Sequence, residues 1–346
     1  MSEFEIREAT ADDRGHVIRL MGNIYPGDVA AHYDWLYRDN PHGRPLTWLA
    51  IESATGEAVG CTSIFPRRVM VAGRERLGSI GGDCYIEPRV RRRGLATRMH
   101  VVSFEGMRRA GIGFMYGPPT PNNLGALVKA GSRLVTSYRR WVRPLTSHGA
   151  YQSAFSRVPT RIEARLAGLP ILMLDQLTKS DARGFTVGEV FEFGDEFNSL
   201  FAAAAPTHPV VCVRDRRYLA WRYRSGNQKA LAVRRDGELV GFTTIEKSGH
   251  EAAIMDIFCP NDARLTDALL RLVIEYATAW GCTRLQLCMT EGCAMARRLL
   301  RHGFIAREER GFQVAVGETD EQAATLLAPT SWHLTEADQD LESIFV

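Results

Sequence analysis

The sequence has no long apolar run, and its positive and negative charges nearly balance. No stretch approaches the roughly 18 consecutive apolar residues that a membrane-spanning helix needs, so we expect no membrane partner. The net charge of +3 is too small to indicate a nucleic-acid partner, although arginines cluster locally. Residues 1–13 are acidic and contain no apolar signal core, which predicts a cytoplasmic protein.

Patterns of disulfide and metal sites are also missing. The seven cysteines, an odd number, include no C-x-x-C pair, so neither a disulfide framework nor a zinc site is predicted. Cys282, Cys288 and Cys293 lie close in sequence, and we interpret them as reduced, packed thiols. The nine histidines follow no ligand spacing, so we expect no metal.

The stretch 82–113 is the most informative part of the chain. Residues 83–86 are typical of a short buried strand, which Glu87 and Pro88 end. An arginine-rich loop follows, and apolar residues then recur with helical spacing until Gly111. The 346 residues are long enough for two domains, and the hairpin-rich sequence before this unit predicts an α+β fold.

The arginine-rich loop has the features of an anion site. Gly94 and Ala96 let backbone N–H groups approach a ligand where the chain turns into the helix. A helix N-terminus has unpaired N–H groups and partial positive charge, which favour phosphate. Arginine can bind phosphate in a bidentate manner. An exposed basic turn is the alternative, and the flanking strand and helix favour the binding interpretation.

These residues resemble the GNAT acyltransferase superfamily. Its pyrophosphate loop follows the pattern Arg/Gln-x-x-Gly-x-Gly/Ala after a strand that ends in x-Pro, and here Arg91-x-x-Gly94-x-Ala96 follows Glu87-Pro88. The resemblance implies acetyl-CoA, or another short acyl-CoA, as the donor substrate. The donor-binding residues that it implies are Tyr85, Ile86, Arg91, Arg92, Arg93, Gly94, Leu95, Ala96, Thr97 and either Asn122 or Asn123. The two asparagines could equally serve as helix caps.

An internal repeat indicates two copies of one fold. Residues 35–38 recur as 221–224, and residues 86–88 correspond to 258–260. We therefore predict two tandem GNAT-like domains, each a mixed, mostly antiparallel sheet flanked by helices. The predicted limits are 1–146 and 184–346, joined by a connecting segment, 147–183, in which Gly168-Leu169-Pro170 is expected to end a helix. Whether the acidic C-terminal residues 335–346 dock stays open.

The second copy lacks the anion-binding loop. Residues 260–266 contain no glycine and a single arginine, and Asp262 adds a charge that repels phosphate. The second domain is therefore expected to be degenerate and to bind no acyl-CoA.

Two carboxylates on the central strand are candidates for the catalytic base. Asp83 and Glu87 share a face by parity, and a GNAT base often lies on this strand. A structural hydrogen bond is the alternative, because a buried unpaired charge is costly. Many GNAT enzymes have a tyrosine that acts as the general acid, and Leu127 stands at its position here. Tyr116 or Tyr138 could replace it, or the mechanism could work without an acid.

The resemblance implies acyl transfer from acyl-CoA to an amine or hydroxyl of a small-molecule acceptor. An amino sugar is one candidate, because the tandem plan and residues 332–335 resemble bacterial GNAT proteins found with cell-surface sugar genes. One alternative is a non-catalytic acyl-CoA sensor. Another is an aminoacyl-tRNA-dependent transferase, against which the intact loop counts.

Overall fold

The computed structural model describes residues 3–147, 161–224, 226–317 and 319–340. These residues form two compact units. Unit 1 comprises Met1–Thr136 with Arg310–Ala328, and unit 2 comprises Ser137–Glu309 with Pro329–Phe345. Each unit therefore includes a piece from the other half of the chain. The limits 1–146 and 184–346, given by sequence order, stay a prediction.

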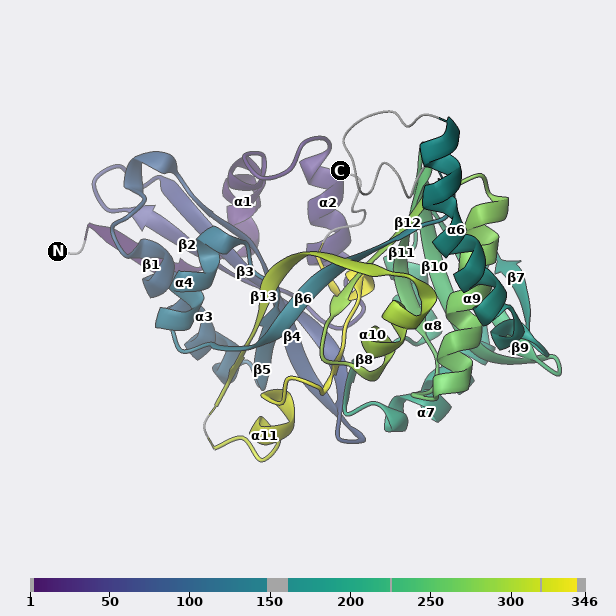
Figure 1. The fold of residues 1–346 in the computed structure, drawn as a ribbon. Helices are drawn as coiled ribbons and strands as arrows, with labels where there is room; N and C mark the ends of the chain where they lie inside the picture. The colour runs from purple at the N-terminus through teal and green to yellow at the C-terminus, as the bar shows by residue number, and fades with distance from the viewer. Residues whose placement is uncertain (1–2, 148–160, 225, 318, 341–346) are drawn as a thin grey trace. The chain divides into compact units, whose positions relative to one another are not determined.

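Unit 1 contains a mixed sheet with the strand order β1-β2-β3-β4-β5-β13 (Figure 1). Its strands are β1 (Phe4–Glu8), β2 (Leu46–Glu52), β3 (Ala58–Val71), β4 (Arg74–Ile86), β5 (Phe114–Gly117) and β13 (Ile305–Val316), of which residues 310–316 belong to this unit. Neighbours run antiparallel except β4 and β5, which are parallel. The predicted mixed, mostly antiparallel α+β sheet is confirmed.

Helices flank this sheet. They are α1 (Arg14–Met21), α2 (Val29–Tyr33), α3 (Leu95–Arg109), α4 (Pro121–Lys129) and α11 (Ala323–Leu326), with short helical turns at Ala11–Asp13, Asp34–Arg38 and Pro88–Val90. Helix α3 buries Leu95, Met99 and Met107 at helical spacing. Its Gly106 lies so close to Trp48 that a Cβ would come within 2.3 Å of the indole ring. Glycine is therefore required there.

The strands β4 and β5 separate soon after they meet. Their pairing covers only Ser79 with Met115 and Ile80 with Tyr116. Further along β4, the register with β3 shifts between Cys61 and Ser63. Such a bulge bends the strand and redirects its side chains. The last residues of β4 therefore have no strand on the β5 side among the residues described.

Unit 2 repeats this arrangement in the order β6-β12-β11-β10-β9-β7. Its strands are β6 (Arg133–Pro144, from residue 137 on), β7 (Thr186–Val190), β8 (Val210–Cys212), β9 (Gln228–Arg235), β10 (Glu238–Ser248), β11 (Glu251–Phe258), β12 (Arg284–Thr290) and β14 (Trp332–His333). Its helices are α6 (Arg161–Thr178), α7 (Asp195–Ala204), α8 (Arg216–Arg222), α9 (Ala263–Ala279) and α10 (Ala294–Leu299), with short helical turns at Lys179–Ala182, Ala205–Thr207, Leu300–His302 and Glu336–Asp338.

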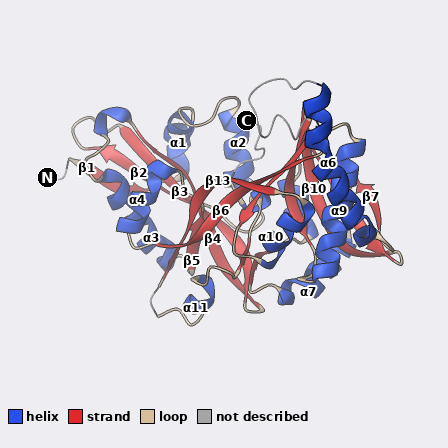
Figure 2. Ribbon diagram, viewed as in Figure 1, coloured by secondary structure: helices blue, strands red, loops and turns tan. Residues whose placement is uncertain are grey.

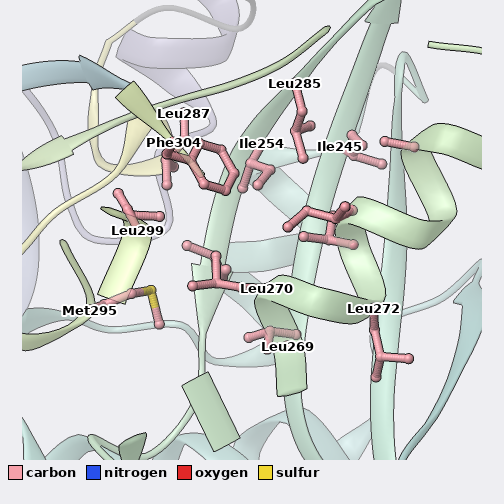
Figure 3. Close-up of a cluster of buried hydrophobic side chains, with 14 of the residues drawn as sticks. Ile245, Ile254, Leu269, Leu270, Leu272, Leu285, Leu287, Met295, Leu299 and Phe304 are labelled. Atoms are coloured by element: carbon pink, nitrogen blue, oxygen red, sulfur yellow. The ribbon is translucent and has the colours of Figure 1, made fainter. Parts of the chain in front are cut away.

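Helix α9 covers the sheet of unit 2 (Figure 2). Leu269 and Leu270 of this helix belong to a buried hydrophobic cluster that also contains Ile254 of β11 and Phe304 (Figure 3). The expected helix end at residues 168–170 is wrong, because α6 continues through Pro170. Residues 148–160 of the predicted connecting segment lie outside the described residues. Among the helices described, none combines the length and apolar composition that a bilayer crossing requires.

Candidate functional site

A cavity of about 580 Å³ lies between the end of β4 and the start of α3. Its lining residues are Cys84, Tyr85, Ile86, Arg91, Arg92, Gly94, Leu95, Ala96, Thr97, Thr120, Asn122 and Asn123. The structure thus brings together every donor residue expected from the sequence except Arg93. The guanidinium of Arg93 pairs instead with Glu3, away from this lining.

The loop that enters α3 presents backbone N–H groups to the cavity. Gly94 precedes the helix in the left-handed conformation, with φ of 73°, which glycine adopts readily. The first intrahelical hydrogen bond from the α3 backbone is donated by Arg98 to the Gly94 carbonyl, at 3.2 Å. The N–H groups of Leu95 to Thr97 therefore have no intrahelical acceptor. No side chain caps this terminus.

The four arginines of the loop have different surroundings. Arg89 forms ion pairs with Glu52 at 2.8 Å and Glu87 at 3.0 Å, so its charge is already neutralised. Arg91 donates to the Ile86 carbonyl at 2.7 Å. Arg92 has no ion-pair partner among the described residues and lines the cavity. Arg91 and Arg92 are therefore the loop arginines that bring positive charge to the cavity lining.

Three polar side chains meet at the inner side of the cavity. The Nε2 atom of His100 lies 2.8 Å from Oδ1 of Asn123, and Sγ of Cys84 lies 3.9 Å from the same nitrogen. Burial lowers the pKa of His100, so the ring is neutral near pH 7. Because a carboxamide oxygen only accepts, Nε2 carries the proton and fixes the Asn123 amide. This contact distinguishes Asn123 from Asn122, which the sequence could not do.

The thiol of Cys84 is a weak nucleophile. Burial raises its pKa to about 11, so the thiolate is scarce at neutral pH. A covalent acyl-cysteine intermediate is accordingly disfavoured.

Asp83 lies at the bulge of β4, beside Cys84. Its side chain is 4% exposed and its φ is 49°, a conformation that non-glycine residues rarely adopt. Tyr25 donates to Oδ1 and Tyr37 donates to Oδ2, both at 2.6 Å. Burial raises the pKa of Asp83, and the two tyrosine hydrogen bonds oppose this only in part. The carboxylate is therefore a better proton acceptor than an exposed aspartate.

Glu87, the second candidate base, has different partners. Its carboxylate pairs with Arg19 at 3.0 Å and with Arg89 at 3.0 Å. It lines an open cavity of about 620 Å³, to which Tyr85 also contributes. Both of its oxygens are thus engaged by arginines, whereas the donors that the described residues bring to the Asp83 carboxylate are the neutral hydroxyls of Tyr25 and Tyr37.

The structure also places the residues considered for the acid. Leu127 is buried in the core of unit 1. Tyr116 is fully buried in unit 1. Tyr138 belongs to unit 2, where its hydroxyl donates to the Cys288 carbonyl at 3.3 Å. None of these three side chains lines the cavity.

Sequence reasoning missed Tyr25 and His100 altogether. Nor did the sequence indicate that Tyr37 contacts Asp83. The sequence carried one usable signal, a carboxylate in an apolar strand, which needs a hydrogen-bonding partner. It could not indicate which hydroxyl supplies one.

One group of side chains in unit 2 has the composition of a metal site. Ligand atoms of Asp181, Asp267 and His302 lie within 4.8 Å of one another. Arg298 and Arg301 both pair with Asp267, and Arg301 also pairs with Asp181 at 3.0 Å. Since two guanidinium groups already neutralise these carboxylates, we interpret the group as an ion-pair network.

The corresponding helix start in unit 2 is closed to anions. The carboxylate of Asp262 caps α9 by accepting from the Leu265 N–H at 2.8 Å. This carboxylate accepts from an N–H group that an anion would otherwise use, and it places a negative charge at the helix N-terminus.

Comparisons with known proteins agree with this geometry. Residues 195–304 match the model of the acetyltransferase (GNAT) family, and residues 5–124 match that of an acetyltransferase (GNAT) domain. No curated protein matches the chain in sequence.

Solved structures share the fold at low sequence identity. A GCN5-related N-acetyltransferase from Anabaena variabilis has a TM-score of 0.62 and 12% identity, over 90% of this chain and 72% of that one. N-myristoyltransferase from Saccharomyces cerevisiae, with bound myristoyl-CoA, has a TM-score of 0.56 and 13% identity, over 91% of this chain and 80% of that one. A tandem GNAT protein from the clavulanic acid biosynthesis pathway has a TM-score of 0.52 and 15% identity, over 92% of this chain and 100% of that one.

Proposed function

This chain belongs to the GNAT acetyltransferase superfamily, with two of its domains in tandem, and we propose that unit 1 is an acyltransferase. It moves an acetyl or other short acyl group from acyl-CoA to an amine or hydroxyl of a small molecule. The observation that carries the proposal is the adjacency of Asp83 and Cys84. One is a buried carboxylate with a raised pKa, and the other lines the cavity at the α3 N-terminus.

The cavity suits the parts of an acyl-CoA donor. The pyrophosphate binds the N–H groups of residues 95–97, with charge supplied by Arg91 and Arg92. The pantetheine arm lies along residues 84–86, where β4 has no strand on the β5 side among those described. The Asn123 amide, held by His100, donates to a carbonyl of the arm.

The reaction is a direct transfer. The acceptor nitrogen or oxygen attacks the thioester carbonyl, the new C–N or C–O bond forms, and the C–S bond breaks with CoA thiolate as the leaving group. Asp83 takes the proton that the acceptor loses through one water, because its carboxylate lies behind Cys84 and does not itself line the cavity. Tyr25 and Tyr37 hold its carboxylate in place. Positioning of donor and acceptor supplies most of the rate enhancement.

Titration calorimetry with acetyl-CoA tests the donor site. Arg92 and Arg93 form a matched pair, because only Arg92 lines the cavity. A charge-assisted hydrogen bond contributes about 1.5–3 kcal/mol, so Arg92→Ala should weaken binding about 10- to 100-fold, whereas Arg93→Ala should change it less than about threefold. Gly94→Trp should abolish binding by filling the loop. Absence of binding by the wild type would contradict the proposal.

An acceptor screen then tests turnover. Release of free CoA, measured with a thiol reagent, should require an added amine or hydroxyl compound, with amino sugars among those tried. Binding of acetyl-CoA without acylation of any acceptor would instead indicate a non-catalytic sensor.

A further inference from the structure

The gap between separating strands in unit 1 has a counterpart in unit 2. Strands β11 and β12 pair only over Glu251–Ile254 and Arg284–Leu287. Beyond this point the register of β10 with β11 shifts between Thr244 and Ile245, as the register of β3 with β4 shifts in unit 1. By the repeat of residues 86–88 at 258–260, Met255 and Asp256 take the places of Asp83 and Cys84.

Residues 331–339 of the chain's own C-terminal part belong to unit 2 (yellow in Figure 1), and residues 333–335 contact both strands at this gap. Toward β12, the Thr290 N–H donates to the Leu334 carbonyl at 3.3 Å, and Thr335 forms a bridge with Met289. Toward β11, the Thr335 hydroxyl donates to Asp256 at 2.8 Å. The segment is therefore hydrogen-bonded to both strands that separate.

Charged groups without solvent contact fix the segment. Arg214 lies 3.0 Å from a carboxylate oxygen of Asp256 and 2.7 Å from one of Asp338, and all three side chains are 0% exposed. Burial alone would lower the pKa of Arg214, but the two carboxylates outweigh it and raise the pKa well above its usual value. Tyr218 adds a hydrogen bond to the Ala337 carbonyl at 2.6 Å.

The apolar side chains of the segment are equally enclosed. Trp332, Leu334 and Ala337 are each 0% exposed. A cavity of about 250 Å³ adjoins the segment, compared with about 580 Å³ for the cavity of unit 1. It is lined in part by Ser331 and His333 of the segment itself.

We propose that residues 331–339 are a permanent internal ligand of unit 2. They occupy the place that the pantetheine arm takes in unit 1, an equivalence that rests on the proposed function of unit 1. The segment closes the gap with a main-chain hydrogen bond to β12, side-chain hydrogen bonds to β11 and the buried Arg214–Asp256–Asp338 cluster. Unit 2 accordingly accepts no acyl-CoA, and the chain binds a single donor molecule.

Hydrogen exchange of the full chain, followed by mass spectrometry, tests the occupancy of the gap without any ligand. Peptides that cover 331–339 should be as protected as those from β11 and β12. Added acetyl-CoA should protect residues 84–97 and leave 331–339 unchanged. Rapid exchange of the segment, or protection of it by acetyl-CoA, would overturn the proposal.

A matched pair of variants tests the anchor. Asp338→Asn should raise the exchange rate of 331–339 roughly a hundredfold, because it leaves Arg214 partly unpaired in a buried site. Asp236→Asn, in an exposed turn of unit 2, should leave it unchanged. If Asp338→Asn fails to fold, Thr335→Val removes the hydroxyl that donates to Asp256 but leaves the Arg214–Asp338 ion pair, and should give a smaller increase. Equal exchange in all variants would contradict the anchor.

Calorimetry gives the number of donor sites. The wild type should bind one acetyl-CoA per chain, and Gly94→Trp should bind none. A second molecule bound by either protein would overturn the internal-ligand proposal while leaving the donor site in unit 1 intact. If the wild type binds none, the proposed function fails, and the exchange measurement still decides whether 331–339 fill the gap.

Discussion

The hydroxyl of Tyr37 lies 2.6 Å from Oδ2 of Asp83, although 46 residues separate the two in sequence. The Tyr37 hydroxyl is also within 2.6 Å of Ser63, which lies 3.0 Å from Thr47. The carboxylate thus terminates a chain of hydroxyl groups that runs across neighbouring strands. Such a network holds the base in one orientation before any acceptor binds.

Asp83→Asn should abolish most acyl transfer. Loss of a general base costs about 10²–10⁴ in rate, so kcat should fall in that range while acetyl-CoA binding stays within about twofold. Glu87→Gln is the matched control, because its carboxylate is engaged by Arg19 and Arg89, and it should retain most activity. Equal losses of kcat in the two variants would contradict the assignment of Asp83 as the general base.

Asp83→Asn should also be more stable than the wild type at high pH. The folded pKa of Asp83 is raised above that of the unfolded chain, so its ionisation disfavours folding. This cost is absent below the unfolded pKa of about 3.9 and reaches its full value above the folded pKa. The melting temperature of Asp83→Asn, relative to that of the wild type, should therefore increase as pH rises above about 4. A difference that is independent of pH would argue against a buried ionised carboxylate.

Tyr37→Phe should shift the pH dependence of the reaction. The Tyr37 hydrogen bond lowers the pKa of Asp83, so its removal raises that pKa and moves the acidic limb of kcat/KM to higher pH. Tyr33→Phe, in the neighbouring α2 helix, is the control, since Tyr33 stacks on Tyr37 with ring centroids 4.3 Å apart. Unchanged pH profiles for both variants would exclude Asp83 as the titrating base.

Cys84→Ala should keep at least about a tenth of the wild-type activity, because the thiol, with a pKa of about 11, is not the acyl carrier. Intact-mass measurement after mixing with acetyl-CoA alone should show no acetylated protein. Alkylation of Cys84 by iodoacetamide should be slow at pH 7, faster at higher pH, and blocked by bound acetyl-CoA. An acetyl adduct on Cys84 would instead establish a covalent intermediate.

Arg214→Leu should strongly destabilise unit 2. Removal of the guanidinium leaves Asp256 and Asp338 buried without their cation, at a cost of about 3–5 kcal/mol. Arg216→Leu is the control, because its ion pair with Asp195 is solvent-exposed and worth less than about 1 kcal/mol. Urea denaturation, followed by hydrogen exchange in β11, measures both effects. Similar losses of unfolding free energy in the two variants would mean that the buried cluster stabilises unit 2 no more than an exposed ion pair does.

The sequence by itself determined the superfamily, the tandem plan and the mixed sheet. These depend on local patterns: a strand, a glycine in the left-handed conformation and an amphipathic helix follow one another within residues 83–109, and the repeat preserves the same order. The sequence also indicated that the N-terminus of α9 in unit 2 does not suit an anion, because Asp262 lies in the capping position next to it. Residues adjacent in sequence decide such features, so composition and periodicity reveal them.

Only the tertiary structure decided which side chains meet. Tyr25 and Tyr37 reach Asp83, and His100 reaches Asn123, through packing between elements that are distant in sequence. Likewise, only long-range pairing assigned residues 310–316 to unit 1 and brought Leu334 and Thr335 against β11 and β12. Strand pairing and burial of charge are set by long-range contacts, and no single stretch of sequence contains both partners.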